Sequence, residues 1–242
     1  MPKTFFEVIG HKLGQKAAQA KNAFDLMGGT EEESLRAEIR LGRDLGTALL
    51  ERTPLVEENQ TTSFVAQIGR WLAGNVQEKK LPFSFHVTAE PQLNAFALPG
   101  GPVFVSWPLV ELCAQQRDEI AFVLGHEMGH ILRRHTLDRL VRDAALSLLL
   151  RQSSGKLAAS AWLGKAGRQV LARAYSKENE LEADAFAIGL IKSAGGEPQA
   201  GERFLEKLEQ WSSGQNVSVL GDYLASHPSP AARLASLRAP GS

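Results

Sequence analysis

The sequence predicts a mostly helical α+β fold with one small antiparallel sheet, and two patterns carry this prediction. Between residues 82 and 106, apolar and polar residues alternate with a period of two, which is typical of half-buried strands. Before residue 80 and after residue 107, apolar residues recur at helical spacing. The length of 242 residues and the hydrophobic content of 43% fit a globular protein that buries its own core.

We expect a single domain over residues 1–242, because no repeat, low-complexity tract or long linker divides the chain. Residues 1–80 form its N-terminal helical scaffold, and residues 82–237 form the core that carries the chemistry. In the scaffold, Thr30 and Glu33 have the spacing of a helix-capping box. Residues 3–21 mix basic and apolar side chains, which favours a terminal helix docked on the domain; a helix lying on a membrane surface is the alternative.

The predicted sheet contains one strand over residues 83–88 and a hairpin. The hairpin has strands at residues 94–98 and 103–106, with the turn at Pro99-Gly100-Gly101 between them. His86 lies on the polar face of the first strand, so we expect it at the surface.

Composition excludes several classes of function. The 27 basic and 27 acidic residues balance, so no global field attracts nucleic acid. A single cysteine, Cys113, excludes an intramolecular disulfide and a metal cage of cysteines. No apolar run approaches the roughly 20 residues of a membrane-spanning helix, and the first residues lack a signal-peptide core. We expect a soluble, cytoplasmic protein, or a periplasmic or membrane-peripheral one if a leader was removed.

The stretch GHEMGHILRRH, residues 125–135, predicts a metal site on a long amphipathic helix. At about 100° per residue, His130 lies only about 40° around the axis from His126, so both imidazoles reach a common point. His135 lies about 180° from His126 and is excluded as a ligand if the helix is regular. Glu127 completes the His-Glu-x-x-His pattern, in which two histidines bind zinc and the glutamate takes a proton from water.

The third ligand is expected from the helical segment SKENELEADAFAIGL, residues 176–190. Glu180 and Asp184 are four residues apart and share a helix face, whereas Glu178 and Glu182 face elsewhere. Glu180 is the candidate ligand, and Asp184 is the candidate acceptor for the second ring nitrogen of a ligand histidine. Small residues flank the ligands on both helices, which allows a close approach; they are Gly129, Ala183 and Ala187.

Together these motifs resemble the gluzincin zinc metallopeptidases. Within them the chain is similar to peptidase family forty-eight, which includes the CAAX prenyl protease, the HtpX heat-shock protease and the BepA-like proteases. Four motifs in the family's order carry the resemblance: LNAFALPGG (93–101), DEIAFVLGHEMGHILRRH (118–135), SKENELEADAFA (176–187) and SHPSPAARLASL (226–237). The resemblance implies a zincin-like catalytic core over residues 82–237, in a soluble minimal form.

The resemblance also implies roles for particular residues. His126, His130 and Glu180 are expected to hold one Zn²⁺ per chain, Glu127 to act as general base and acid, and Asp184 to orient a ligand histidine. Asn94, Ala95, Phe96 and Ala97 are expected to form an edge strand that binds an extended peptide.

His227 comes from the terminal HP…R motif, and three roles stay open for it. It stabilises an oxyanion, it closes the fourth zinc position, or it is a loop histidine without chemistry. Arg233 is expected to anchor the loop to an acidic side chain. Relatives place membrane-related or cleft-covering helices in residues 142–175, so here this segment is expected to pack as a lid.

The sequence therefore predicts a zinc endopeptidase that acts on polypeptides, in protein quality control. The alternative is a latent or non-catalytic zinc protein that binds polypeptide like a chaperone, with His227 closing the metal site. A third reading is a helical protein whose motif arose by chance. Peripheral membrane contact is an open alternative, and the sequence does not indicate an oligomeric state.

Overall fold

The computed structural model describes residues 30–50, 54–77, 81–140, 175–214, 223, 226–227 and 229–239. The basic segment 3–21 and nearly all of the segment 142–175 that was expected to be a lid lie outside these residues. Among the helices that are described, none is long and apolar enough to cross a bilayer.

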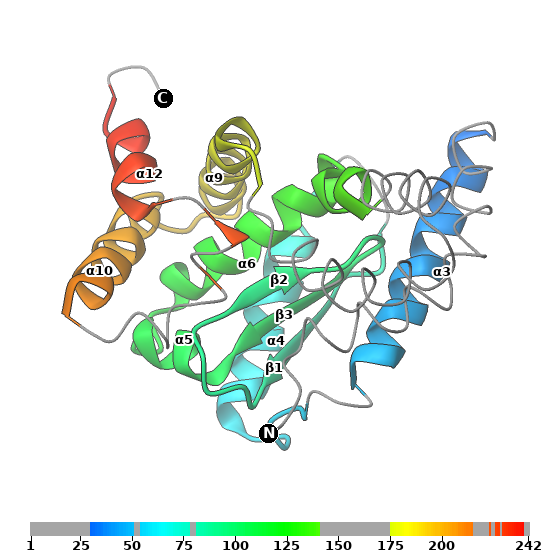
Figure 1. Cartoon of the computed structure of the whole chain (residues 1–242), viewed down its shortest axis with the longest axis horizontal. Coiled ribbons are helices and arrows are strands. Elements are labelled where there is room, and N and C mark those ends of the chain that lie inside the picture. Colours follow the sequence, from blue (N-terminus) through cyan, green and yellow to red (C-terminus); the bar gives the residue numbers. More distant parts are fainter. Residues whose placement is uncertain are drawn as a thin grey trace, which may run out of the picture.

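A three-stranded sheet lies at the centre of the fold (Figure 1). Its strands are β1 (Ser84–Thr88), β2 (Ala95–Ala97) and β3 (Pro102–Ser106), in the order β1-β3-β2. The hairpin of β2 and β3 is antiparallel as predicted, but β1 pairs with β3 in parallel, so the sheet is mixed. The chain crosses from β1 to the far edge and returns through the hairpin into the middle. A period-two pattern does not reveal that order.

Two glycines make the hairpin turn possible. Gly100 and Gly101 have φ angles of 81° and 132°, which favour glycine. A Cβ at Gly101 would lie 2.6 Å from the carbonyl oxygen of Pro82, so the turn also has no room for a side chain. The predicted Pro-Gly-Gly turn is therefore confirmed.

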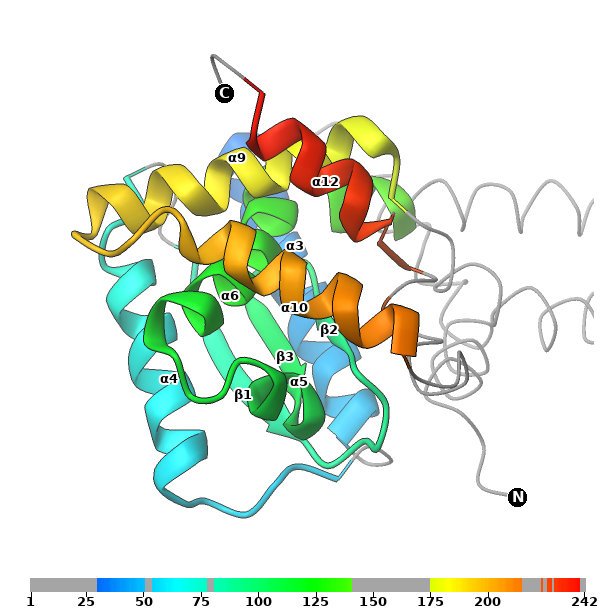
Figure 2. The ribbon, with the colours of Figure 1, turned by 90° about the vertical axis from the view of Figure 1, so that its left-hand side faces the viewer.

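The two faces of the sheet are covered by different helices (Figures 1 and 2). On one face, Phe104 packs with Leu45 and Leu49 of α3 (Glu31–Leu50). His86 stacks on Phe104 at 5.1 Å between ring centroids and is half-buried, so the predicted surface histidine is only partly exposed. Val87, Val103 and Val105 belong to the larger core, on the face covered by α4 (Gln60–Ala73) and α6 (Arg117–Leu132).

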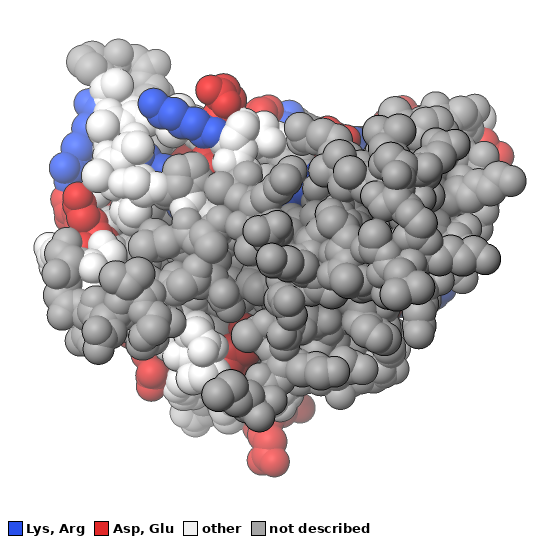
Figure 3. Space-filling model, in the orientation of Figure 1, with Lys and Arg blue, Asp and Glu red and all other residues white. Residues whose placement is uncertain are grey.

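The remaining helices are α5 (Trp107–Leu112), α9 (Lys177–Ser193), α10 (Ala200–Gly214) and α12 (Pro230–Leu237). The predicted cap of α3 is confirmed, because the backbone N–H of Thr30 donates to Glu33 at 2.8 Å. On the face shown in Figure 3, small acidic and basic patches lie beside one another over the described residues. One contact of this kind joins Arg238, which follows α12, to Glu202 of α10.

The prediction of one long amphipathic helix from residue 118 onwards is wrong in two respects. Every residue of α6 from Glu119 to Leu132 is buried, so the helix is enclosed on all sides. The helix then ends at Leu132, where Arg133 and Arg134 form a turn and Arg134 has a φ of 60°. A second helical segment follows over residues 135–140. The mixed α+β, mostly helical fold class itself is confirmed.

Candidate metal centre

Two histidines of α6 form the base of the site. His126 and His130 are one turn apart, and their Nε2 atoms lie 3.1 Å from each other. Both side chains are buried. The helical spacing therefore places two ring nitrogens at one point, as the sequence predicts.

Helix α9 lies against α6 at small residues and thereby brings in a carboxylate. A Cβ at Gly129 would lie 3.1 Å from the Cα of Ala183, and one at Gly125 would lie 3.3 Å from the Cα of Ala187. The predicted close approach is thus present, with Gly125 as a fourth small residue that the sequence reading missed. A larger residue at either glycine would push α9 away from the histidines.

The approach of α9 places Glu180 against both histidines. Its Oε2 lies 3.5 Å from His126 Nε2, and its Oε1 lies 3.3 Å from His130 Nε2. Glu180 is fully buried. The burial of a carboxylate is tolerated only where it is paired or holds a metal.

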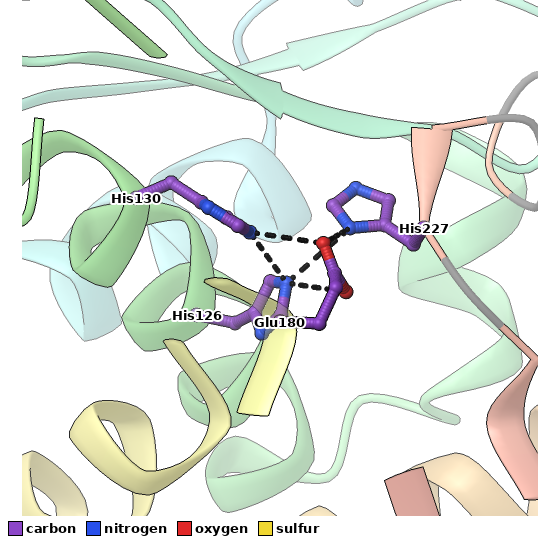
Figure 4. A group of neighbouring side chains, drawn as sticks. All are labelled: His126, His130, Glu180 and His227. Carbon is purple, nitrogen blue, oxygen red and sulfur yellow. Dashed lines mark hydrogen bonds and ion pairs between the residues drawn. The ribbon is translucent and has the colours of Figure 1, made fainter. Parts of the chain in front are cut away.

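His227 is the fourth member of the cluster (Figure 4). Its Nδ1 lies 2.9 Å from Glu180 Oε1 and 3.4 Å from His126 Nε2. One ligand atom from each of His126, His130, Glu180 and His227 lies within 4.8 Å of the others. In Figure 4 these side chains converge from α6, α9 and the segment before α12.

The outward nitrogen of His126 is held by a buried ion pair. Asp184 Oδ1 lies 2.8 Å from His126 Nδ1. Arg233 of α12 donates to the same carboxylate, with its Nε 2.8 Å from Oδ2. Arg233 thus contacts an acidic side chain, as expected, and links α12 to the site.

The outward nitrogen of His130 meets a different partner. His135 Nδ1 lies 3.0 Å from His130 Nδ1, so the prediction that His135 points off the opposite side is wrong. The turn at Arg134 ends the regular helix on which that prediction rested. Tyr175 stacks on the His130 ring with 3.8 Å between centroids and 16° between planes. Residue spacing gave no signal for this tyrosine.

Glu127 is buried beside the cluster, and among the described residues neither of its carboxylate oxygens has a hydrogen-bond partner. His227 Nε2 lies 3.6 Å from Glu127 Oε1. Burial raises the pKa of Glu127. An orphaned, buried carboxylate is costly unless a ligand or water completes it.

Burial and charge separate the pKa values of the other groups. Burial lowers the pKa of His130 well below its usual value, which keeps the ring neutral. Burial alone would raise the pKa of Asp184, but the charge of Arg233 and the hydrogen bonds from His126 and Arg233 together outweigh it and lower the pKa to about 2. For His227, burial would lower the pKa, but the charge of Glu180, its hydrogen bond to His227 and the charge of Glu127 together outweigh burial and raise the pKa.

The proposed peptide-binding strand lies next to this site. β2 is at one edge of the sheet and contacts α6. The side chains of Asn94, Ala95 and Ala97 are buried, and Phe96 stacks on Phe104 at 5.0 Å. The side chains of this strand are therefore occupied within the fold.

The donor set fits zinc. Two neutral imidazoles and a carboxylate are a known ligand set of catalytic zinc sites, and such a site keeps a further position for water or substrate. The orphaned oxygens of Glu127 and the Oε2 of Glu180 are buried polar atoms that a metal and its water would satisfy.

The fold and the site together define a zinc metallopeptidase domain of the gluzincin type. Residues 59–241 match the family described as Peptidase family M48, and the chain belongs to this family.

Curated relatives carry names of proteases. The beta-barrel assembly-enhancing protease of Yersinia pestis is 30% identical over 216 residues, which is 85% of this chain and 44% of that protein. Its counterpart in Escherichia coli strain K12 is 29% identical over the same length. The mitochondrial metalloendopeptidase OMA1 of Schizosaccharomyces pombe is 29% identical over 175 residues, which is 72% of this chain and 51% of that protein. This chain therefore spans about half the length of the curated relatives it matches.

Proposed function

We propose that this chain is a zinc-dependent endopeptidase in which His126, His130 and Glu180 hold one Zn²⁺. The observation that carries the proposal is the buried, unpartnered carboxylate of Glu127 beside that donor cluster. A protein gains nothing in stability from such a group, so its place is explained by chemistry. Membership of peptidase family M48 supports the same reaction class.

The metal would supply Lewis acidity, polarising the scissile carbonyl and lowering the pKa of a water molecule to about 7. Glu127 then takes a proton from the water whose oxygen bonds to the carbonyl carbon. The raised pKa of Glu127 suits the second step, in which this carboxylic acid gives the proton to the leaving nitrogen as the C–N bond breaks.

Asp184 keeps His126 in the form that binds metal. Its carboxylate accepts the Nδ1–H of His126, which leaves the lone pair on Nε2 toward the cluster. Arg233 in turn fixes the carboxylate with two donors.

We propose that the substrate is an extended polypeptide that pairs with the edge of β2. Pairing through the backbone imposes little sequence preference, because the side chains of Asn94, Ala95 and Ala97 already lie in the protein interior. Such tolerance suits misfolded or damaged proteins, and it supports a role in protein quality control. The relatives' names, an assembly-enhancing protease and a metalloendopeptidase, are compatible with this class of substrate.

A second candidate is a latent form that binds polypeptide without turnover. The observation that favours it is the position of His227, which joins the other three donors as a fourth. With four protein ligands, a zinc ion would have no place for water. The competing role for His227 is stabilisation of the developing oxyanion, which requires it beside the metal but not on it.

Two variants test these proposals on a fluorescently labelled unfolded protein. Glu127→Ala is expected to abolish cleavage while zinc stays bound, and undiminished proteolysis by this variant would rule out the proposed mechanism. His227→Ala then separates the two roles of His227. Faster cleavage identifies a closing ligand, whereas a loss of about 100-fold in kcat identifies an oxyanion donor.

A further inference from the structure

His130 and His135 form a contact between two imidazoles directly behind the metal cluster. Their Nδ1 atoms are 3.0 Å apart, which is hydrogen-bond distance. One nitrogen must carry a proton and donate it, and the other must accept with its lone pair. Both rings are buried, so the contact is shielded from solvent.

The break after α6 is what brings His135 to this place. In a continuous helix, a residue five positions after His130 would point about 140° away from it. Here Arg134 takes a left-handed φ of 60°. Its guanidinium holds that turn by donating to Ser34 of α3 at 2.9 Å and by approaching Glu38 at 3.5 Å. The strained turn is therefore anchored on a helix from the other end of the described chain.

The second nitrogen of His135 settles the direction of the contact. His135 Nε2 lies 3.4 Å from Glu182 Oε2. A carboxylate accepts hydrogen bonds, so the proton of a neutral His135 belongs on Nε2 and its lone pair on Nδ1. His130 must then donate from Nδ1, which leaves the lone pair of His130 Nε2 toward His126 and Glu180.

We propose that His135 and Glu182 form a relay that holds His130 in its metal-binding tautomer, so that His135 is a positioning residue of the metal centre. The proposal rests on the proposed function, because it takes His130 as a ligand. Tyr175 fixes the plane of the His130 ring by stacking, and the contact with His135 fixes the direction of His130 Nδ1 within that plane. Glu182 is held in turn by Arg133, whose Nε lies 3.1 Å from Oε1.

The test compares two substitutions of His135 in the full chain. His135→Asn places an amide oxygen close to the position of Nδ1 and keeps an acceptor for His130. His135→Phe keeps an aromatic ring of similar shape and removes the acceptor. Because the loss of an outer partner of a ligand histidine weakens metal binding about 10- to 100-fold, His135→Phe is expected to lose zinc affinity by this factor. His135→Asn is expected to recover most of it.

The matched control is His86→Phe. His86 is another histidine in contact with an aromatic ring, half-buried rather than buried, and its partners are Phe104 and Ser84, away from the cluster. Zinc affinity, measured by competition with a chromophoric chelator, is expected to be unchanged in this variant. Thermal unfolding of the metal-free proteins shows whether each variant is folded.

Nuclear magnetic resonance of the zinc-loaded, ¹⁵N-histidine-labelled protein gives a readout that does not depend on activity. The chain has 6 histidines, so their ring nitrogens can be assigned individually. The wild type is expected to show a slowly exchanging Nδ1–H on His130, which His135→Phe loses and His135→Asn keeps. Wild-type protein that binds no zinc would overturn the proposed function. Tight zinc binding by the wild type, with equal affinities of His135→Phe and wild type or equal losses in both His135 variants, would overturn the relay.

Discussion

The two histidines of α6 are both proposed zinc ligands, but different residues support their outward ring nitrogens. The outward nitrogen of His126 meets Asp184 directly, and Arg233 holds that carboxylate in a fully buried pair. The outward nitrogen of His130 meets His135, which leads to Glu182, whose side chain is 51% exposed. One support therefore ends in the protein interior and the other at the surface.

This difference determines how each support responds to change. A buried ion pair that loses one partner leaves an uncompensated charge in the interior, which is strongly destabilising. When a carboxylate at the surface loses its charge, water solvates the groups that remain, so little stability is lost. We expect the His126 side to govern stability and the His130 side to govern metal affinity with little effect on stability.

The largest effect is expected from Arg233→Met. This change leaves the carboxylate of Asp184 buried without its guanidinium, and breaking such a pair costs about 3–5 kcal/mol of folding free energy. Urea unfolding of the metal-free protein measures this loss. Arg238→Met, directly after the same helix, is the control, because Arg238 is exposed and pairs with Glu202 at the surface. Equal unfolding free energies for the two variants would contradict the role assigned to Arg233.

Gly129→Val tests the contact between α6 and α9 that both supports share. Its side chain would meet Ala183 and Phe186, where even a Cβ lies 3.1–3.2 Å from their atoms. Overpacking of this kind destabilises by about 1–3 kcal/mol, and we expect weaker zinc binding as Glu180 is displaced. Gly189→Ala on α9 is the matched control, since a Cβ there meets nothing within 4 Å. If the valine variant keeps wild-type stability and zinc affinity, the helix contact does not position the site.

Acid should weaken the His126 side in a defined pH window. The pKa of Asp184 is about 2 in the folded protein against 3.8 as its ordinary value. A lowered carboxyl pKa stabilises the fold above the ordinary value, and this stability is lost as the pH falls from 3.8 to about 2. The difference corresponds to about 2 kcal/mol. Unfolding of metal-free protein across this range measures it, with the double variant Asp184→Asn, Arg233→Met as the control that lacks this contribution. Equal slopes of unfolding free energy against pH in the wild type and the double variant would refute this contribution.

The smallest effect on stability is expected from Glu182→Gln. A half-exposed ion pair contributes about 0–1 kcal/mol, so the unfolding free energy should hardly change. Zinc affinity should fall, because an amide fixes the tautomer of His135 less firmly than a carboxylate. Glu178→Gln, an exposed glutamate on the same helix, is the control for both measurements. A loss of stability in Glu182→Gln as large as that in Arg233→Met would remove the distinction between the two sides.

Much of this arrangement follows from residue spacing. Helical geometry places His126 beside His130 and puts Glu180 and Asp184 on one face, and the Pro-Gly-Gly turn indicates the hairpin. These features are local, so a single sequence carries them. The pairing of β1 with β3 is not local, and alternation alone does not specify which strand is the neighbour.

The position of His135 could not be predicted from residue spacing. No glycine or proline marks the end of α6, and the turn depends on contacts of Arg134 with α3, which lies 100 residues away along the chain. The available signal was the spacing of five positions from the apolar Leu132 to the apolar Leu137, which breaks helical periodicity. Tyr175 had no signal of this kind, since only the folded chain brings it to His130.

Zinc stoichiometry after dialysis against chelator and reconstitution tests the central claim most directly. The wild type should retain one zinc ion per chain, Glu127→Ala should retain it as well, and Glu180→Ala should bind it far more weakly. Less than about half an equivalent of tightly bound zinc in the wild type would contradict the metal centre, as would undiminished affinity in Glu180→Ala.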